Sequence, residues 1–472
     1  MLDLLLDKAT ILNMDTNPII YSTLSTIAAR MKDKIGALDL AKLTFDVINT
    51  STSLKEKAAS YALLSEALFH VGAKSTSYNL LKLAISVIRR VSDIKIRFPL
   101  NLFASYLALE HRDETLAKNL MKNSLFLLHA LRVQKYSYET FLLHAAKLYV
   151  IYGCSWLESL MKKAILNLEE KRRKIVQLAV ARSLVISVKP SIIQLNSLKK
   201  IIELLLSELD DRLLYDYALA YALAASIFKF KGDVQTYNQF MKKSNHILDL
   251  IGDNIEKELA KISLIYNYVI EKNKQNIKSL LEKVELAIRK KAETITKKFA
   301  SLTLEKLQKE IERIEDAMID YVFLTTRASR ILADYEILKR AELMAYNLVV
   351  PINRARMLLE VAIGYACLKR PSDVLRILND VLRIISHEPN KLPGVSALIL
   401  ALGRAIALNP ELTIDCLRIF DLGCEYVEGV SPSTLYIAFL TEISNELRRL
   451  EGTGIEFIPI LSRTEETEFS AE

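Results

Sequence analysis

Residues 36–45 read Gly-Ala-Leu-Asp-Leu-Ala-Lys-Leu-Thr-Phe, a pattern of small and large apolar side chains that returns along the chain. Five turns set its phase: Gly36, Gly72, Arg112, Gly153 and Gly232. A small residue lies seven positions before each turn, at Ala29, Ser65, Ser105, Ala146 and Ala225. A bulky apolar residue follows four of the turns by nine positions. This repetition predicts one helix hairpin stacked on copies of itself.

Further turns follow at Lys189, Asn273, Ala333, Arg370 and Asn409. Most intervals leave room for two helices of about four turns each, joined by short connections. With 12 Gly and 10 Pro in 472 residues, the chain is poor in the turn residues on which an all-β protein depends. We therefore predict an all-α fold of about ten antiparallel helix hairpins and a closing helix, without a sheet.

The segment 36–45 resembles the second helix of a tetratricopeptide (TPR) repeat, and so does the segment 112–117 that leads to Met121. Tyr61 and Tyr221 stand where that family places an aromatic residue in the first helix. The units are longer than the family's ~34 residues, so the chain is described as TPR-like. The resemblance implies a right-handed α-solenoid whose first helices line a concave groove.

The spacing of the turns predicts four parts. Residues 1–273 form an N-terminal TPR-like array, 274–335 an irregular segment, and 336–450 a C-terminal array with its closing helix. Residues 451–472 are expected to be a flexible acidic tail, and the alternative is that Phe457 and the apolar residues after it dock on the last hairpin.

The irregular segment contains a heptad pattern that predicts a long charged helix. The seam residues are Leu304, Leu307, Ile311, Ile314, Met318 and Tyr321. Two interpretations remain open: the helix lies on its neighbours, or the chain self-associates through 304–321.

No catalytic or metal-binding motif is present. No two of the six His residues have the i, i+4 spacing of a helical metal pair. The four Cys residues include no CxxC, which indicates reduced thiols packed as small apolar side chains. We therefore predict a protein that is not an enzyme and has no catalytic residue, metal ion or cofactor.

The most apolar windows, 217–228 and 395–408, are shorter than the ~20 residues that span a bilayer, so no membrane association is expected. A secretory signal is not expected either, because residues 1–14 contain Asp3 and Asp7 and lack a basic start. These features favour a cytoplasmic protein. Few Gln and many Lys and Glu residues favour a thermophilic source.

Binding is the function that a stacked array supports best. The resemblance implies that first-helix side chains line the groove, which gives these candidates for contact with a partner: Arg30, Lys34, Glu66, His70, Tyr106, Glu110, Lys147 and Lys229. We predict a protein–protein interaction scaffold that holds a segment of a protein or peptide partner there. The net charge of +8 leaves a nucleic-acid or other polyanion partner as the alternative. An enzyme whose site is dispersed in sequence is the second alternative.

Two further expectations and one open alternative follow from this interpretation. Exposed groove charges contribute little to stability, so replacing Arg30 and Lys147 together with Ala should leave melting nearly unchanged. Gly36, Gly72 and Gly232 should adopt positive φ at their turns. Five tyrosines share one helix face, which is either core or a stacking platform in the groove: Tyr21, Tyr61, Tyr149, Tyr221 and Tyr266.

Overall fold

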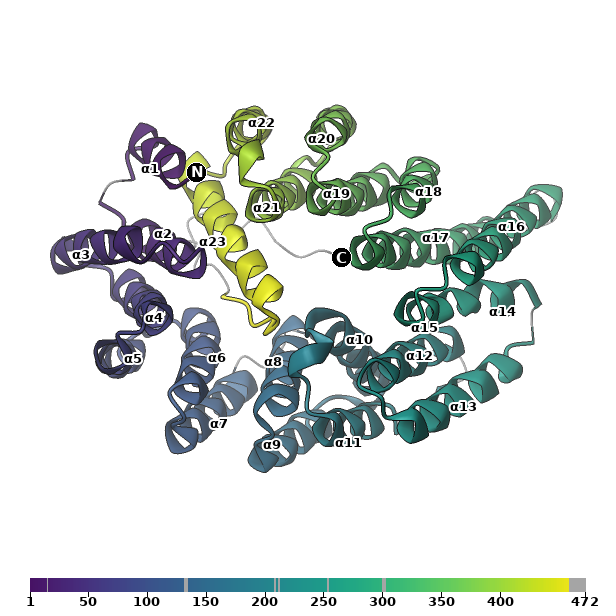
Figure 1. Cartoon of the computed structure of the whole chain (residues 1–472), viewed down its shortest axis with the longest axis horizontal. Coiled ribbons are helices and arrows are strands. Elements are labelled where there is room, and N and C mark those ends of the chain that lie inside the picture. The colour runs from purple at the N-terminus through teal and green to yellow at the C-terminus, as the bar shows by residue number, and fades with distance from the viewer. Residues whose placement is uncertain are drawn as a thin grey trace. The chain divides into compact units, whose positions relative to one another are not determined.

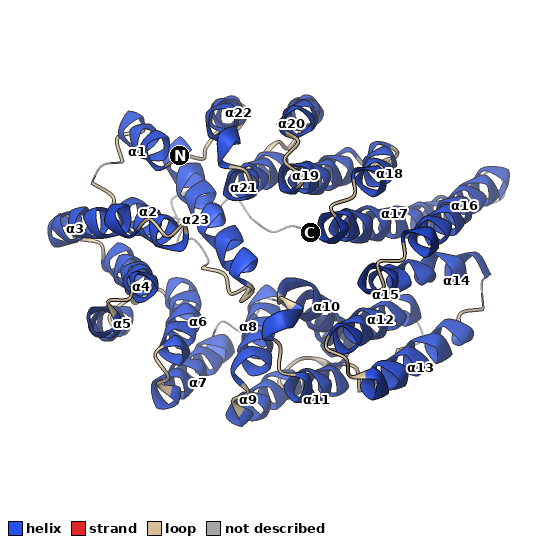
Figure 2. Cartoon of the chain, in the orientation of Figure 1, coloured by secondary structure: helices blue, strands red, loops and turns tan. Residues whose placement is uncertain are grey.

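The computed structural model describes residues 1–14, 16–130, 135–207, 209–210, 213–252, 254–298 and 303–457. Over these residues the chain forms 23 α-helices and no strand, so the all-α prediction is confirmed (Figure 2). None of the described helices combines the length and hydropathy needed to cross a bilayer.

The chain divides into two compact units, and α11 (Leu195–Leu205) and α21 (Leu392–Leu408) belong partly to each. Unit 1 comprises Met1–Ile201 and Leu402–Glu472, and unit 2 comprises Ile202–Ala401. Unit 1 contains α1 (Leu2–Ile11), α2 (Pro18–Arg30), α3 (Lys34–Thr50), α4 (Leu54–Val71), α5 (Lys74–Ile88), α6 (Ile94–Glu110), α7 (Glu114–Ala130), α8 (Lys135–Tyr152), α9 (Ser155–Leu166), α10 (Glu170–Ser187), α22 (Thr413–Glu425) and α23 (Pro432–Glu451). Unit 2 contains α12 (Leu214–Phe230), α13 (Val234–Leu250), α14 (Asn254–Ala260), α15 (Ile265–Ile270), α16 (Lys274–Lys298), α17 (Leu304–Leu332), α18 (Tyr335–Tyr346), α19 (Pro351–Cys367) and α20 (Pro371–Ser386).

This grouping differs from the predicted division at 273, 335 and 450. Unit 1 combines the two ends of the sequence, because α23 packs on α2 and Lys8 of α1 forms an ion pair with Asp421 of α22. Tyr436 of α23 also donates a hydrogen bond to the main-chain carbonyl of Leu5. Turn spacing carries no information on such long-range contacts.

Successive helices pack as hairpins, for example α2 with α3, α4 with α5 and α12 with α13 (Figure 1). Hydrogen bonds from small polar side chains connect the two helices of a hairpin. Ser65 of α4 donates to the carbonyl oxygen of Ser77 in α5 at 2.8 Å. Forty residues earlier, Ser25 of α2 makes the same bond to Ala37 of α3 at 2.7 Å. Equivalent residues therefore recur at a spacing of 40, and the chain is a helical-repeat protein.

The turns between paired helices have left-handed backbone at the predicted Gly72, Arg112 and Gly232, with φ of 102°, 61° and 82°. The prediction for Gly36 is wrong: its φ is not positive, and it lies inside α3. The left-handed residue of that turn is Lys32, with φ of 68°. The turn of the first repeat therefore lies at Lys32, four residues before the predicted Gly36. Ser25, not Ala29, is then the equivalent of Ser65.

An Asp or Asn follows many of these left-handed residues and caps the next helix. The side chains of Asp33, Asp113 and Asp233 accept hydrogen bonds from the main-chain N–H three residues later. Asn273 does the same after Lys272. Each cap satisfies a helix donor that has no partner within the helix.

Gly72→Ala is expected to lower the free energy of unfolding by about 1 kcal/mol, because a Cβ disfavours left-handed backbone. No atom lies within 4 Å of the place where that Cβ would be, so the loss reports backbone strain alone. Gly252 has equally open surroundings without a positive φ. Gly252→Ala is therefore the control, and urea unfolding should show little change for it. Equal effects of the two replacements would contradict the backbone argument.

The tyrosine face belongs mainly to the core: Tyr149 and Tyr221 are buried, and Tyr61 packs against a cluster that includes Leu64 and Leu68. Tyr21 is half-buried, and the side chain of Tyr266 lies outside the described residues. The predicted tail is described only as far as Phe457, and 458–472 lie outside the described residues.

Candidate functional site

Four of the predicted groove residues lie together in unit 1, on the first helices of successive hairpins. Arg30 is on α2, Glu66 on α4, Tyr106 on α6 and Lys147 on α8, and all four are buried. His70 and Glu110 are half-buried one turn further along α4 and α6. We call the surface formed by Arg30, Glu66, Phe103 and Lys147 the inner face.

Two predicted residues lie elsewhere. Lys34 is exposed at the start of α3, which is the second helix of its hairpin. The prediction put it on a first helix because the true turn, at Lys32, lies four residues before Gly36. Lys229 lies in unit 2 and forms an ion pair with Glu271. Lys34 is therefore not a residue of the inner face, and Lys229 belongs to the other unit.

The inner face is covered by α23. Glu66 is the centre of a buried ion network: Arg448 of α23 donates from Nε to its Oε1 at 2.7 Å, and Arg30 donates to the same oxygen. The side chains of both arginines are 0% exposed and that of Glu66 is 1% exposed. Burial alone would raise the pKa of Glu66, but Arg448 and Arg30 outweigh it and hold that pKa far below its usual value.

The network continues on either side of Glu66. Arg30 also pairs with Glu451 at the end of α23. The guanidinium of Arg448 lies 5.2 Å from the centre of the Phe103 ring, a cation–π contact. The expectation that Arg30 and Lys147 are exposed groove charges is therefore wrong, and their replacement should not leave melting unchanged.

The chain after α23, residues 452–457, also lies on the inner face and has no regular secondary structure. The carbonyl of Gly452 accepts from the main-chain N–H of Lys189 at 3.0 Å, and that of Gly454 from Nζ of Lys147 at 2.6 Å. Asn445 of α23 bonds to both main-chain groups of Phe457, accepting from its N–H at 2.9 Å and donating to its carbonyl at 3.1 Å. Main-chain groups of Gly452, Gly454 and Phe457 are therefore paired, although the segment has no regular secondary structure.

Side chains of the segment are held as well. The ring of Phe457 is 2% exposed and meets that of Phe103 edge-on, with centres 5.0 Å apart. Glu456 accepts from Arg449 at 3.0 Å. Gly454 passes so close to α10 that a Cβ there would lie 2.3 Å from the carbonyl oxygen of Ser187. The alternative expectation for Phe457 was correct in that this residue docks, but it docks on α6 and α23.

Sequence reasoning missed Asn445, Arg448 and Phe103. No signal in the sequence marks the two residues on α23: Glu442, Asn445, Glu446 and Arg448 give the helix a polar face that is nevertheless buried. In sequence this face is indistinguishable from a solvated one.

His144 is buried beside this site on α8, where Nε2 lies 3.3 Å from the hydroxyl of Ser105. Burial and the neighbouring Lys147 lower its pKa to about 3. The unfolded chain therefore binds more protons than the folded chain between pH ~6.5 and ~3. Stability is fully present above pH ~6.5 and falls as the pH falls through this window, by up to about 1.4 kcal/mol per pH unit from this group.

His144→Gln is accordingly expected to flatten the dependence of the unfolding free energy on pH between 6.5 and 4, measured by urea unfolding. His246 is exposed, so His246→Gln is the matched control and should leave the slope unchanged. An unchanged slope for the His144 variant would contradict a buried neutral imidazole.

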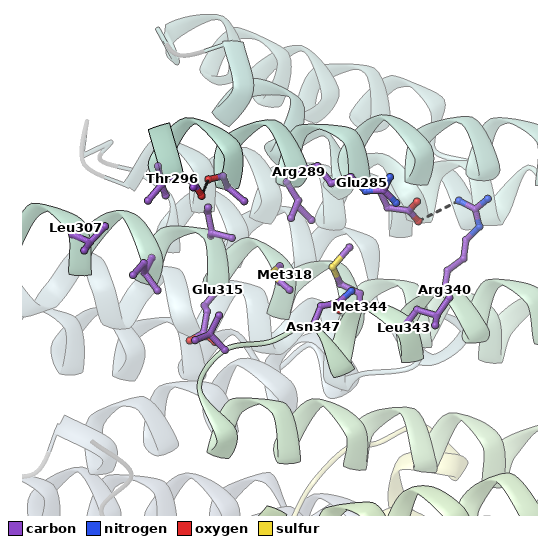
Figure 3. Close-up of a pocket in the computed structure, with 16 residues that line it drawn as sticks. Glu285, Arg289, Thr296, Leu307, Glu315, Met318, Arg340, Leu343, Met344 and Asn347 are labelled. Carbon is purple, nitrogen blue, oxygen red and sulfur yellow. Dashed lines mark hydrogen bonds and ion pairs between the residues drawn. The ribbon is translucent and has the colours of Figure 1, made fainter. Parts of the chain in front are cut away.

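A hollow of about 740 Å³ lies in unit 2 between α16, α17 and α18 (Figure 3). Its lining is mainly apolar and includes Ile288, Leu307, Ile311 and Leu343. The charges at its ends are paired: Glu285 with Arg340 at 3.2 Å, and Glu315 with the main-chain N–H of Val350 at 2.7 Å. The hollow can therefore take an apolar group without leaving these ions unpaired.

The hollow follows the predicted heptad seam. The long helix is confirmed as α17, and its seam divides into two halves. Met318 and Tyr321 are buried within unit 2, whereas Leu304 is 83% exposed and Ile311 37% exposed; Leu307, Ile311, Ile314 and Met318 line the hollow. Packing on neighbours accounts for the second half only. Self-association through 304–321 stays a prediction for the first half.

If the chain self-associates there, Ile311→Glu is expected to weaken the association at least tenfold, because a carboxylate would be buried among apolar side chains. Sedimentation velocity over a range of concentrations measures this. Ile414 in unit 1 is more exposed than Ile311, at 52% against 37%, so Ile414→Glu is the control. A chain that is monomeric at every concentration, with or without the replacement, would end this interpretation.

No protein-family model matches the sequence, and no curated protein matches it. Among solved structures, the chain is similar to a "circular tandem repeat protein with novel repeat topology and enhanced subunit contact surfaces", with 12% identity and a TM-score of 0.27 over 95% of this chain and 98% of the other. It is also similar to the structure "human IFIT1 dimer with m7Gppp-AAAA", with 12% identity and a TM-score of 0.22 over 90% and 94%. The assignment as a helical-repeat protein rests on the helices and turns of the chain itself.

Proposed function

We propose that this protein is a non-enzymatic scaffold that binds a segment of a protein partner on the inner face of unit 1. One observation carries the proposal: this face already holds a non-helical peptide segment, the chain's own residues 452–457. The atoms that hold it come from α6, α8, α23 and the residues after α10, which are far apart in sequence.

The kinds of contact suit a peptide better than a reacting substrate. Lys147 and Asn445 bond to main-chain atoms, which every protein segment carries, and Phe103 contributes an aromatic wall for one side chain. Arg449 binds carboxylates: it donates to Glu442, Glu446 and Glu456. A segment with an acidic and an aromatic residue is therefore the ligand that these groups complement.

A TPR-like ancestry is part of the proposal. The support is the recurrence of left-handed residues at Lys32, Gly72 and Arg112, 40 residues apart, with an Asp cap after Lys32 and Arg112. First helices of these repeats provide Arg30, Glu66 and Lys147, which is the position that the TPR resemblance implies for binding residues.

Capture of partners by the full-length protein from its native cells tests the function. The partner should be a protein, remain bound after nuclease treatment, and be lost with Lys147→Met but kept with Lys34→Ala, which alters an exposed lysine away from the inner face. A partner released by nuclease would instead support the polyanion alternative. Equal capture by the two variants would show that the inner face is not the site.

A further inference from the structure

We propose that residues 452–457 are an intramolecular ligand that covers Phe103 and Lys147 on the inner face and is displaced by a partner segment of the same chemistry: Gly-x-acidic-aromatic, with left-handed backbone at the glycine. This inference rests on the proposed function and adds the class of partner segment and its regulation. Each position of the motif corresponds to one contact of the segment.

At position 454 there is room only for glycine. The main chain at this residue has a φ of 56°, and a Cβ would lie 2.3 Å from the carbonyl oxygen of Ser187. Since that oxygen belongs to the main chain of α10, it moves only if the helix end moves. A partner segment therefore needs glycine where its carbonyl receives the Nζ of Lys147.

The next positions select side chains. Ile455 is 0% exposed, which limits the size of the side chain at this position, and we leave its identity open as the variable position. Glu456 faces Arg449, whose Nη2 donates to it at 3.0 Å. Phe457 fills the space beside Phe103 while Asn445 holds its main-chain N–H and carbonyl. An acidic residue followed by an aromatic residue satisfies all of these groups.

Because the segment is attached to the protein, it competes strongly with a free peptide for the same contacts. Residues 452–457 follow α23 directly, so their effective concentration at the inner face is on the order of millimolar or higher. A free peptide with the same contacts must displace a tethered one, and its apparent affinity falls by the fraction of time that the site is open. Weakening the tethered segment should therefore strengthen binding of the free one.

The experiment measures binding of a fluorescent peptide, Gly-Thr-Gly-Ile-Glu-Phe-amide, to full-length protein by fluorescence anisotropy. We expect at least tenfold tighter binding to Phe457→Ala and to Glu456→Lys than to the unchanged protein. The second variant alters an exposed side chain, so it tests the same point if the first fails to fold. Glu428→Lys, an exposed site in unit 1 away from the segment, should bind as the unchanged protein does.

A peptide with alanine in place of its last residue, or of its second glycine, should lose at least tenfold of its affinity for the Glu456→Lys protein. Circular dichroism confirms that each variant is folded. The inference is overturned if folded Glu456→Lys protein does not bind the peptide, or if it binds no better than the Glu428→Lys control. If a native partner is still captured in a Lys147-dependent way, only the motif and its regulation fail. If no protein partner depends on Lys147, the proposed function fails with them.

Discussion

Glu66→Leu is expected to lower the free energy of unfolding of unit 1 by about 3–5 kcal/mol, because it leaves the buried guanidinium groups of Arg30 and Arg448 without their shared carboxylate. Both arginine side chains are 0% exposed, so water cannot replace the lost partner. Glu451 still pairs with Arg30, whereas among the described residues Arg448 keeps Asn445 and the Phe103 ring. Thermal and urea unfolding followed by circular dichroism measure the loss.

The triple variant Arg30→Met, Glu66→Leu and Arg448→Met is the control. Replacing a whole buried ion network with apolar side chains of similar size is often neutral or stabilising, since no charge then remains to be desolvated. We therefore expect the triple variant to be more stable than Glu66→Leu alone. If the single and triple variants lose equal stability, the loss comes from packing rather than from unpaired charge.

The turns and helices of this chain were largely predictable because they depend on neighbours in sequence. Gly72 and Gly232 lie at left-handed turns as expected, since glycine pays no Cβ penalty there. The error at Gly36 has the same origin: Lys32 adopts φ of 68° although it is not glycine, and Asp33 caps the following helix. A glycine in the first turn of that helix was mistaken for the turn itself.

For the candidate site, the positions of some residues could be predicted from the sequence, but their burial could not. First-helix positions predicted Arg30, Glu66 and Lys147 as groove residues, and in the structure Arg30 and Glu66 form an ion pair. Their exposure was wrong because their partners are remote: Glu66 and Arg448 are 382 residues apart, and Lys147 and Gly454 are 307 apart. Period and spacing describe one stretch of chain at a time, so they could not show that the end of the chain covers its beginning.

Gly454→Ala is expected to cost at least about 2 kcal/mol more than Gly429→Ala. Both glycines have positive φ, 56° and 85°, so each replacement brings backbone strain of about 1 kcal/mol. At Gly429 nothing lies within 4 Å of the new Cβ, whereas at Gly454 it meets the carbonyl oxygen of Ser187. The segment 452–457 must then move away, which exposes Ile455 and Phe457 at about 1.5–3 kcal/mol for each side chain.

Two measurements on the full-length protein check this. Urea unfolding gives the difference in stability between the two variants. Limited digestion with chymotrypsin gives access to Phe457, which is 2% exposed in the docked segment. We expect cleavage after Phe457 to be at least tenfold faster in Gly454→Ala than in Gly429→Ala. Equal stability together with equal cleavage would mean that α10 yields at Ser187 and the segment stays docked, so that glycine would no longer be required in a partner segment.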